Sequence, residues 1–335
     1  MGPMVKLSLL DLVPVLQGGT IGEALARAAD LAAHAEHLGY YRYWTAEHHG
    51  MPGIASAATS VVLAHVGAAT HRIRIGAGGI MLPNHAPLAI AEQFGTLDAL
   101  FPGRVDLGLG RAPGSDQQVA RALRRTLAGG AEQFPQDIME LQAYFAGDER
   151  AGFIATPGAG ADVPIWILGS SLYGAQLAAA LGLPYAFASH FAPDALDEAL
   201  HIYRRDFRPS AQLREPYTMA GFNIFAADSH EEAETIATSM MQSVIALRTG
   251  RPGRLAPPVP GYRDSLPPQG LAILAGHLSA SSIGTKEDVV RDLDAFVRRT
   301  RVDEVIVSAM IHDQAARKRS FAIAMEAARE VAAAA

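Results

Sequence analysis

The segment that decides the fold is residues 41–50, Tyr-Arg-Tyr-Trp-Thr-Ala-Glu-His-His-Gly, a short aromatic run that ends in three ionisable groups. Aromatic side chains favour the pleated, half-buried backbone of a strand. A segment with helical spacing, residues 22–38, precedes the run and stops at a glycine, as helices often do. Because ligands bind at the carboxyl ends of the strands in parallel α/β proteins, this strand is predicted to deliver Glu47, His48 and His49 to a binding site.

The rest of the chain repeats this alternation of strand and helix. Segments with helical patterns separate seven further apolar runs, at residues 5–10, 73–83, 104–109, 164–168, 185–188, 217–227 and 304–308. Eight strands that alternate with helices predict an α/β protein of the (β/α)₈ TIM-barrel type, and 335 residues suit one such barrel with insertions. We therefore expect a single domain over residues 1–335, with an insertion at about 112–163.

Residues 249–269 differ from the rest of the chain because six prolines alternate there with arginines and glycines. Each proline removes a backbone N–H donor, so we expect no regular helix or strand in this segment. A loop of this length in a compact domain is usually a lid or disordered. Since it precedes the last strand of the predicted barrel, on the side where ligands bind, we expect a mobile lid.

The composition excludes several classes of protein. The formal charge of −6 is spread without long runs of one sign, which favours neither nucleic acid nor an anionic membrane surface as a partner. The absence of cysteine excludes disulfides and a thiolate nucleophile, and it suits a reducing cytoplasm. No apolar run approaches membrane-spanning length, and the N-terminus has no secretion signal. A small-molecule substrate is the simplest expectation.

Glycines mark the ends of the third and fourth predicted strands. Gly78 and Gly79 are adjacent, and a glycine pair inside a strand usually indicates a bulge, an unusual peptide geometry or the close approach of a ligand. Arg111 follows in a loop dense in glycine, residues 108–116. Backbone N–H groups and a guanidinium in such a loop suit an oxyanion.

The fifth predicted strand runs into Gly169, Ser170 and Ser171, which precede a helix rich in alanine and leucine. The first-turn N–H groups of a helix are unpaired and carry the positive end of its dipole, and serine hydroxyls add donors. This pattern is typical of a phosphate site.

These motifs occur in one order along the chain: Trp44-Thr45-Ala46-Glu47-His48-His49, then residues 76–83, then residues 102–111, then Leu168-Gly169-Ser170-Ser171. In this the chain resembles the bacterial-luciferase-like flavin-dependent monooxygenases over nearly its whole length, and it is most similar to their non-luminescent branch. The resemblance implies a barrel with insertions that binds reduced FMN, or the deazaflavin F420 in some branches, and often activates O₂.

The resemblance also implies roles for individual residues. His48 matches the active-site histidine of the family, near the flavin ring, and is the predicted catalytic residue. Gly78 and Gly79 fall where the family has a non-proline cis peptide against the ring face. The predicted cofactor-binding set is completed by Glu47, Gly169 and Ser171, and by the matches to phosphate-binding positions, Arg111, Ser170 and Tyr173, the last being a threonine in the luciferases.

Each of these residues also has a purely structural interpretation. His48 could be a histidine at the barrel rim bonded to Glu47, Gly78-Gly79 a simple bulge, and Arg111 a partner in a salt bridge. Adjacent strand residues face opposite ways, so His49 is expected to be structural. His85 and His190 are expected to be hydrogen-bonded rim residues.

The predicted function is a flavin-dependent monooxygenase that uses reduced FMN and O₂ on a small organic substrate, with a separate flavin reductase as a possible partner. The alternatives are F420-dependent hydride transfer and a non-catalytic flavin-binding protein. A metal-dependent hydrolase using Glu47, His48, His49 and His190 is disfavoured, because adjacent histidines diverge. A homodimer is expected through the helices at residues 57–69 and 87–100, which carry small side chains.

Overall fold

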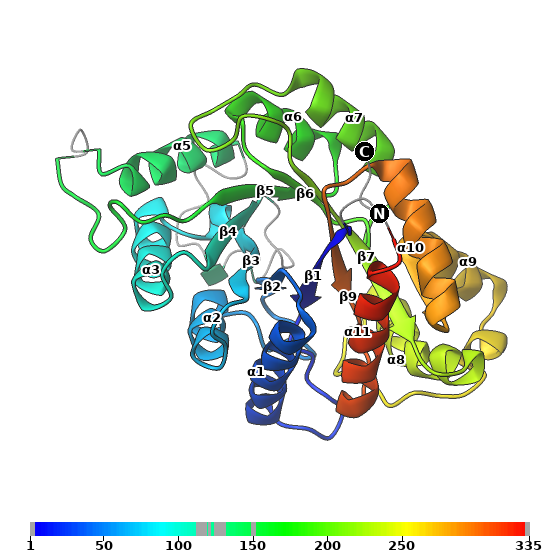
Figure 1. Ribbon diagram of the computed structural model, residues 1–335. Coiled ribbons are helices and arrows are strands. Elements are labelled where there is room, and N and C mark those ends of the chain that lie inside the picture. The colour runs from blue at the N-terminus through cyan, green and yellow to red at the C-terminus, as the bar shows by residue number, and fades with distance from the viewer. Residues whose placement is uncertain (1–3, 112–118, 120–121, 124–131, 149–151, 332–335) are drawn as a thin grey trace.

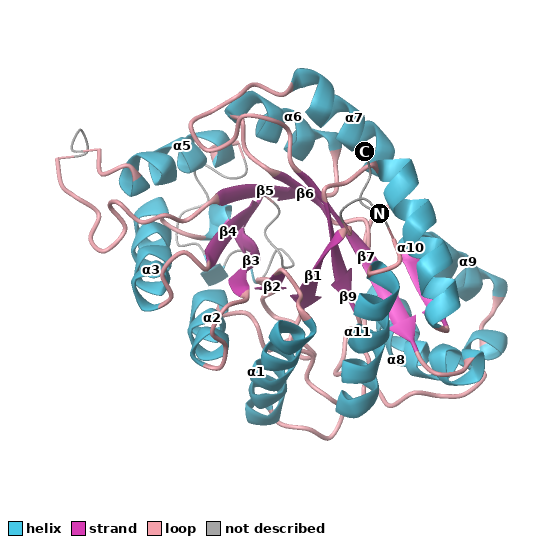
Figure 2. Ribbon diagram, in the orientation of Figure 1, coloured by secondary structure: helices cyan, strands magenta, loops and turns pink. Residues whose placement is uncertain are grey.

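The computed structural model describes residues 4–111, 119, 122–123, 132–148 and 152–331. Its centre is a closed parallel barrel with helices around it (Figures 1 and 2). The strands are hydrogen-bonded in the order β6-β5-β4-β3-β2-β1-β9-β7, and pairing of β6 with β7 closes the ring. The predicted (β/α)₈ architecture is confirmed. No helix in the described ranges is long and apolar enough to cross a membrane.

The barrel strands are β1 (Lys6–Asp11), β2 (Arg42–Thr45), β3 (Arg74–Met81), β4 (Val105–Gly110), β5 (Ile165–Gly169), β6 (Tyr185–Phe187), β7 (Thr218–Ala226) and β9 (Glu304–Ser308). The α-helices are α1 (Ile21–Leu38), α2 (Thr59–Ala68), α3 (Pro87–Leu100), α5 (Phe134–Phe145), α6 (Leu172–Leu181), α7 (Leu196–Asp206), α8 (His230–Arg248), α9 (Pro268–His277), α10 (Lys286–Thr300) and α11 (Gln314–Ala328). Most of residues 112–131, the first part of the expected insertion, lies outside the described residues.

A ninth strand, β8 (Ser281–Gly284), lies outside the barrel and has no counterpart in the sequence analysis. The long strand β7 makes this possible, because it serves two partners. Its residues 219–223 pair with β9, while residues 223–226 pair with β8. A run of four residues, Ser-Ser-Ile-Gly, is too short to show a strand period, so only the partner strand defines it.

The proline-rich segment 249–269 contains more regular structure than the sequence indicates. It includes a 3₁₀ turn, η3 (Tyr262–Ser265), and Pro268 is the first residue of α9, where a missing N–H group costs no helical hydrogen bond. The expectation that no regular element forms is wrong at these two places.

The same segment is anchored to the barrel by its backbone. The Leu255 N–H donates to the Val15 carbonyl and the Leu255 carbonyl accepts from Gln17 N–H, both at 2.8 Å. Further along, the Val259 N–H donates to Thr238 Oγ1 of α8 at 2.8 Å. These contacts place the segment over the loop that follows β1, at the carboxyl end of the barrel. Whether it moves when ligands bind stays a prediction.

Two tryptophans fill the interior of the barrel. Trp44 of β2 and Trp166 of β5 meet edge to face, with ring centroids 5.2 Å apart, and both are buried. The apolar side chains packed with them come from other strands and include Leu10, Met219 and Ile306. Trp44 is therefore a core residue, and its ring supports the strands from inside.

A buried ion network occupies the amino-terminal end of the barrel. Arg42 Nη1 donates to Asp106 at 2.7 Å and Arg42 Nε donates to Glu304 at 2.9 Å, so one guanidinium connects β2, β4 and β9. Arg74 of β3 holds the other oxygen of Asp106 at 2.6 Å. Burial opposes the charged form of Arg42, but the carboxylates of Glu304 and Asp106 outweigh it and raise its pKa. This end of the barrel is built for stability.

Replacement of Arg42 by methionine should lower the free energy of unfolding by about 3–5 kcal/mol, because Glu304 would stay buried without a cation and Asp106 would keep only Arg74. Urea denaturation measures this. The matched control is Arg298→Met, whose side chain is 78% exposed in its pair with Asp294 and which should change stability little. Equal losses in the two variants would contradict the assignment.

Candidate functional site

The residues singled out in the sequence lie at one end of the barrel. His48 follows β2, Gly78 and Gly79 lie in β3, and Arg111 follows β4. Ser170 and Ser171 follow β5. Since all barrel strands are parallel, each of these segments ends at the same rim, which is where active sites of such barrels lie. The fold therefore gathers the predicted site residues on one face.

Gly78 and Gly79 are joined by a cis peptide bond, and the pairing of β3 with β4 shifts register between Gly78 and Ile80. A Cβ on Gly78 would lie 2.8 Å from the Trp44 ring, and one on Gly79 would lie 2.6 Å from the carbonyl oxygen of Gly108. Packing alone thus requires glycine at both positions. The segment therefore has both an irregular strand register and a cis peptide bond.

Arg111 and the first turn of α6 lie side by side. The Arg111 guanidinium stacks over the Tyr173 ring, 4.2 Å from its centroid. Ser171 is the N-cap of α6, yet its side chain makes no capping hydrogen bond, and both Ser170 and Ser171 are exposed. Arg111 makes no ion pair with any residue in the described part of the chain, which removes the salt-bridge alternative there. Unpaired first-turn N–H groups, free hydroxyls and a guanidinium suit a phosphate.

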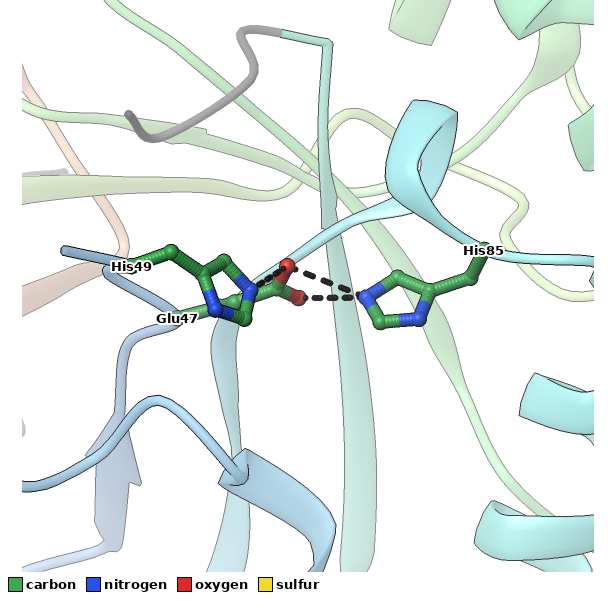
Figure 3. A group of neighbouring side chains, drawn as sticks. All are labelled: Glu47, His49 and His85. Carbon is green, nitrogen blue, oxygen red and sulfur yellow. Dashed lines mark hydrogen bonds and ion pairs between the residues drawn. The ribbon is translucent and has the colours of Figure 1, made fainter. Parts of the chain in front are cut away.

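The buried Glu47 side chain is at the centre of a cluster of partly exposed side chains (Figure 3). His49 Nε2 lies 2.7 Å from Glu47 Oε1, and His85 Nε2 lies 2.9 Å from Glu47 Oε2. Asn84 Nδ2 donates to Oε1 at 3.1 Å. The expected structural role of His49 and the expected hydrogen bond of His85 are therefore seen, with one carboxylate as the common partner.

Glu47 also bonds to the backbone of β3 beyond the glycine pair. Its own N–H donates to the Gly79 carbonyl at 3.1 Å, and its Oε2 accepts from the Met81 N–H at 3.0 Å. Burial opposes the charged form of Glu47, but the bonds from His85, Asn84 and Met81 outweigh it and lower its pKa. Through these bonds Glu47 holds the end of β3 and the turn after it next to the loop that follows β2. Its predicted direct contact with a cofactor stays a prediction.

His190 lies close to His48 across the mouth of the barrel. It is half-buried, and its Nδ1 is buried with no hydrogen-bond partner in the part of the chain that the structure describes. A Cβ on Gly221 would lie 2.0 Å from that nitrogen, so glycine is needed beneath the ring. Burial, followed by the charges of His277 and His48, lowers the pKa of His190 to about 4. His190 is therefore neutral at physiological pH, an environment that the sequence did not reveal.

His277, at the end of α9, was not singled out in the sequence. Its ring packs against Phe191, with centroids 6.3 Å apart, and burial lowers its pKa. It reaches the site because α9 folds back towards the strand ends. No local sequence pattern indicates that His277 lies near this site, since α9 begins within a proline-rich segment that resembles a loop.

Comparisons with known proteins find relatives over nearly the whole chain. A family model described as luciferase-like monooxygenase matches residues 6–304. A protein of Escherichia coli K12 named luciferase-like monooxygenase is 51% identical over 328 residues, which is 98% of each chain. The crystal structure of apo-MsnO8 is 33% identical, covers 96% of this chain and 98% of that one, and has a TM-score of 0.91.

More distant structures share the fold and carry two kinds of cofactor. The oxygenating constituent of 3,6-diketocamphane monooxygenase from Pseudomonas putida, in complex with FMN, is 17% identical with a TM-score of 0.70 and covers 98% of each chain. An F420-dependent secondary alcohol dehydrogenase is 13% identical with a TM-score of 0.66, covering 97% of this chain and 99% of that one. At these identities the likeness concerns the fold alone.

The environment of His190 predicts a loss of stability in acid. Its folded pKa of about 4 lies below the ordinary value of 6.5, so the unfolded chain takes up a proton first as the pH falls. Stability present at neutral pH is thus lost between pH 6.5 and 4. The free energy of unfolding falls by up to about 3 kcal/mol, because each unit of difference between the unfolded and folded pKa values contributes about 1.4 kcal/mol.

Urea denaturation at pH 7 and at about pH 4.5 measures this effect. His190→Gln should reduce the acid-induced loss of stability, while His201→Gln, at an exposed position on α7, should leave it as in the wild type. An acid response of His190→Gln identical to that of the wild type would contradict the assignment.

Proposed function

Because the chain belongs to the luciferase-like monooxygenase family, we propose that it is an FMN-dependent monooxygenase that acts on a small organic substrate with O₂. The observation that carries the choice of FMN is the pairing of Arg111 with the uncapped first turn of α6. FMN ends in a phosphate, and this is the group that such a turn binds best.

The phosphate would be held by Arg111, by the hydroxyls of Ser170 and Ser171, and by the N–H groups of the α6 first turn. Tyr173 stands where the luciferases have a threonine. Its ring stacks with Arg111 and so orients the guanidinium, and we propose that Tyr173 acts on the phosphate through this arginine. Gly169 carries no side chain at the end of β5, which leaves the phosphate access to the helix N-terminus.

The ring would lie against the backbone of Gly78 and Gly79. Glu47 supports this proposal, because it bonds to the backbone of β3 at two places, the Gly79 carbonyl and the Met81 N–H, and so fixes the strand next to the glycine pair. When bound, reduced FMN supplies the electrons that activate O₂. The Pro-rich segment 249–269 would then exclude water from the site as a lid.

His48 is the proposed catalytic residue. It follows β2 at the mouth of the barrel and lies near enough to His190 to contribute to its lowered pKa. We propose that its imidazole exchanges a proton with the reacting groups, whereas His190 is held neutral and can only offer hydrogen bonds.

The F420 alternative remains a second candidate, since the same fold serves an F420-dependent enzyme. It is separated from the first by its reaction: hydride transfer needs no O₂, whereas the proposed monooxygenase consumes it. A non-catalytic flavin-binding protein would retain flavin without turnover. A separate reductase as the source of reduced FMN stays a prediction. A cytoplasmic location, which the absence of cysteine suits, also stays a prediction.

Arg111→Ala should weaken the binding of FMN by about 1.5–3 kcal/mol, the usual loss for a hydrogen bond to a charged group. Riboflavin, which lacks the phosphate, is the internal control and should bind equally to both proteins. Fluorescence titration measures both affinities. A similar loss for the two ligands would place Arg111 away from the phosphate.

His48→Ala should keep FMN affinity within about twofold and abolish turnover with reduced flavin, because its ring would act at the reacting edge and not at the phosphate. Parallel measurement of FMN affinity and flavin-dependent O₂ consumption checks this. Turnover at the wild-type rate would remove His48 from the catalytic machinery.

A homodimer is also proposed, with α2 and α3 at its interface. Large apolar side chains are exposed on both helices, namely Val61 at 68% and Leu100 at 58%. Light scattering at micromolar concentration should give twice the mass of one chain, and Val61→Glu should shift the mass towards one chain. A wild-type monomer would contradict the proposal.

A further inference from the structure

We propose that Glu47, His49 and His85 form a site for a divalent transition ion such as Zn²⁺. The site is separate from the flavin chemistry proposed above and does not depend on it. Two imidazoles and one carboxylate are the protein ligands of several zinc sites in which water completes the coordination. The same set also suits other first-row divalent ions.

The three side chains offer ligand atoms that converge on one point. One oxygen of Glu47, one ring nitrogen of His49 and one of His85 all lie within 4.8 Å of one another. Figure 3 shows the two rings on either side of the carboxylate, each directing a nitrogen at it. In the described part of the chain, this is the one group of three such residues with that geometry.

The backbone explains why these residues converge. Glu47 and His49 are two positions apart in an extended segment, so their side chains point to the same side. His85 comes from a different place, directly after the 3₁₀ turn η1 (Leu82–Asn84) that follows β3. Adjacent histidines such as His48 and His49 diverge and cannot bind one ion together. This set uses only His49 of the two, so that argument does not exclude it.

The ring-to-carboxylate distances are now those of hydrogen bonds, 2.7 Å for His49 and 2.9 Å for His85. A tetrahedral Zn²⁺ with bonds of about 2.0–2.1 Å needs its ligand atoms about 3.3 Å apart, so the ion would replace the protons shared with the carboxylate. The rings would retreat by about 0.5 Å. They have room, because their side chains are 17% and 27% exposed, and this exposure also gives the ion a path of entry.

The carboxylate is held in advance by outer contacts. Asn84 Nδ2 donates to one oxygen at 3.1 Å and the Met81 N–H donates to the other at 3.0 Å, while the Glu47 side chain is 1% exposed. Such outer contacts orient ligands in metal sites and are worth 10–100-fold in affinity. Only the two histidines need to adjust, so the site is largely formed before the ion arrives.

The test is titration of the tag-free protein with Zn²⁺ by isothermal calorimetry, and with Co²⁺ by visible absorption, which distinguishes a protein-bound ion of low coordination number from the hydrated ion. One ion should bind per chain at micromolar concentration. His49→Ala and His85→Ala should each weaken binding more than tenfold, and Asn84→Ala by about tenfold. His48→Ala is the matched control, since this histidine lies between two ligands in sequence but near His190, and it should leave Zn²⁺ affinity unchanged.

Retention of wild-type Zn²⁺ affinity in both His49→Ala and His85→Ala would overturn the site. So would the absence of saturable one-to-one binding to the wild type, and the Co²⁺ spectrum of the wild type decides the question if a variant fails to fold. Circular dichroism identifies such variants. Each of these outcomes leaves the FMN proposal untouched, because FMN affinity is measured separately on the metal-free protein.

Discussion

The hydrogen bonds of Glu47 are the interactions on which the rest of the site depends. This carboxylate lies at the end of β2, yet its contacts run to β3, to the turn that follows β3 and to two histidines. Because it is buried and charged, each missing partner would leave part of its desolvation uncompensated. The protein therefore holds the cis Gly78-Gly79 segment and the ends of two strands in one arrangement. The same arrangement brings together the side chains of Glu47, His49 and His85.

The two ends of the barrel divide the work. At the amino-terminal end, Arg42 is enclosed by Asp106 and Glu304 and links three strands. At the carboxyl end, some polar groups have no partner among the described residues, for example His190 Nδ1 and the side chain of the α6 N-cap Ser171. Between the two ends the Trp44 and Trp166 rings fill the interior. Unpaired groups are tolerated at the rim because the buried network and the core supply the stability.

The sequence predicts the fold well because the patterns that define strands and helices are local. Each barrel strand and most helices have their own hydrophobic period, and the order of motifs at the strand ends indicates the face on which they meet. The placement of Arg111 beside Tyr173 follows from that order. By contrast, β8 depends on its partner β7, and α9 begins at a proline inside a segment that resembles a plain loop.

The partners of Glu47 show where such prediction ends. No pattern in the sequence links Glu47 to His85, 38 residues further on, and the bond exists only because η1 turns the chain back over the end of β2. The same holds for His277 near His190 and for the glycine beneath the His190 ring. Residue type and order predict which side chains reach the rim. Which of them are paired there depends on contacts between distant segments.

The central claim is that the carboxyl end of the barrel binds FMN with its phosphate at the N-terminus of α6. The most direct measurement is a crystal structure of the protein grown with FMN. We expect phosphate oxygens within hydrogen-bond distance of Arg111 and of the N–H groups that follow Ser171, with the ring against Gly78 and Gly79. A flavin bound elsewhere, or a phosphate that does not contact α6, would contradict it.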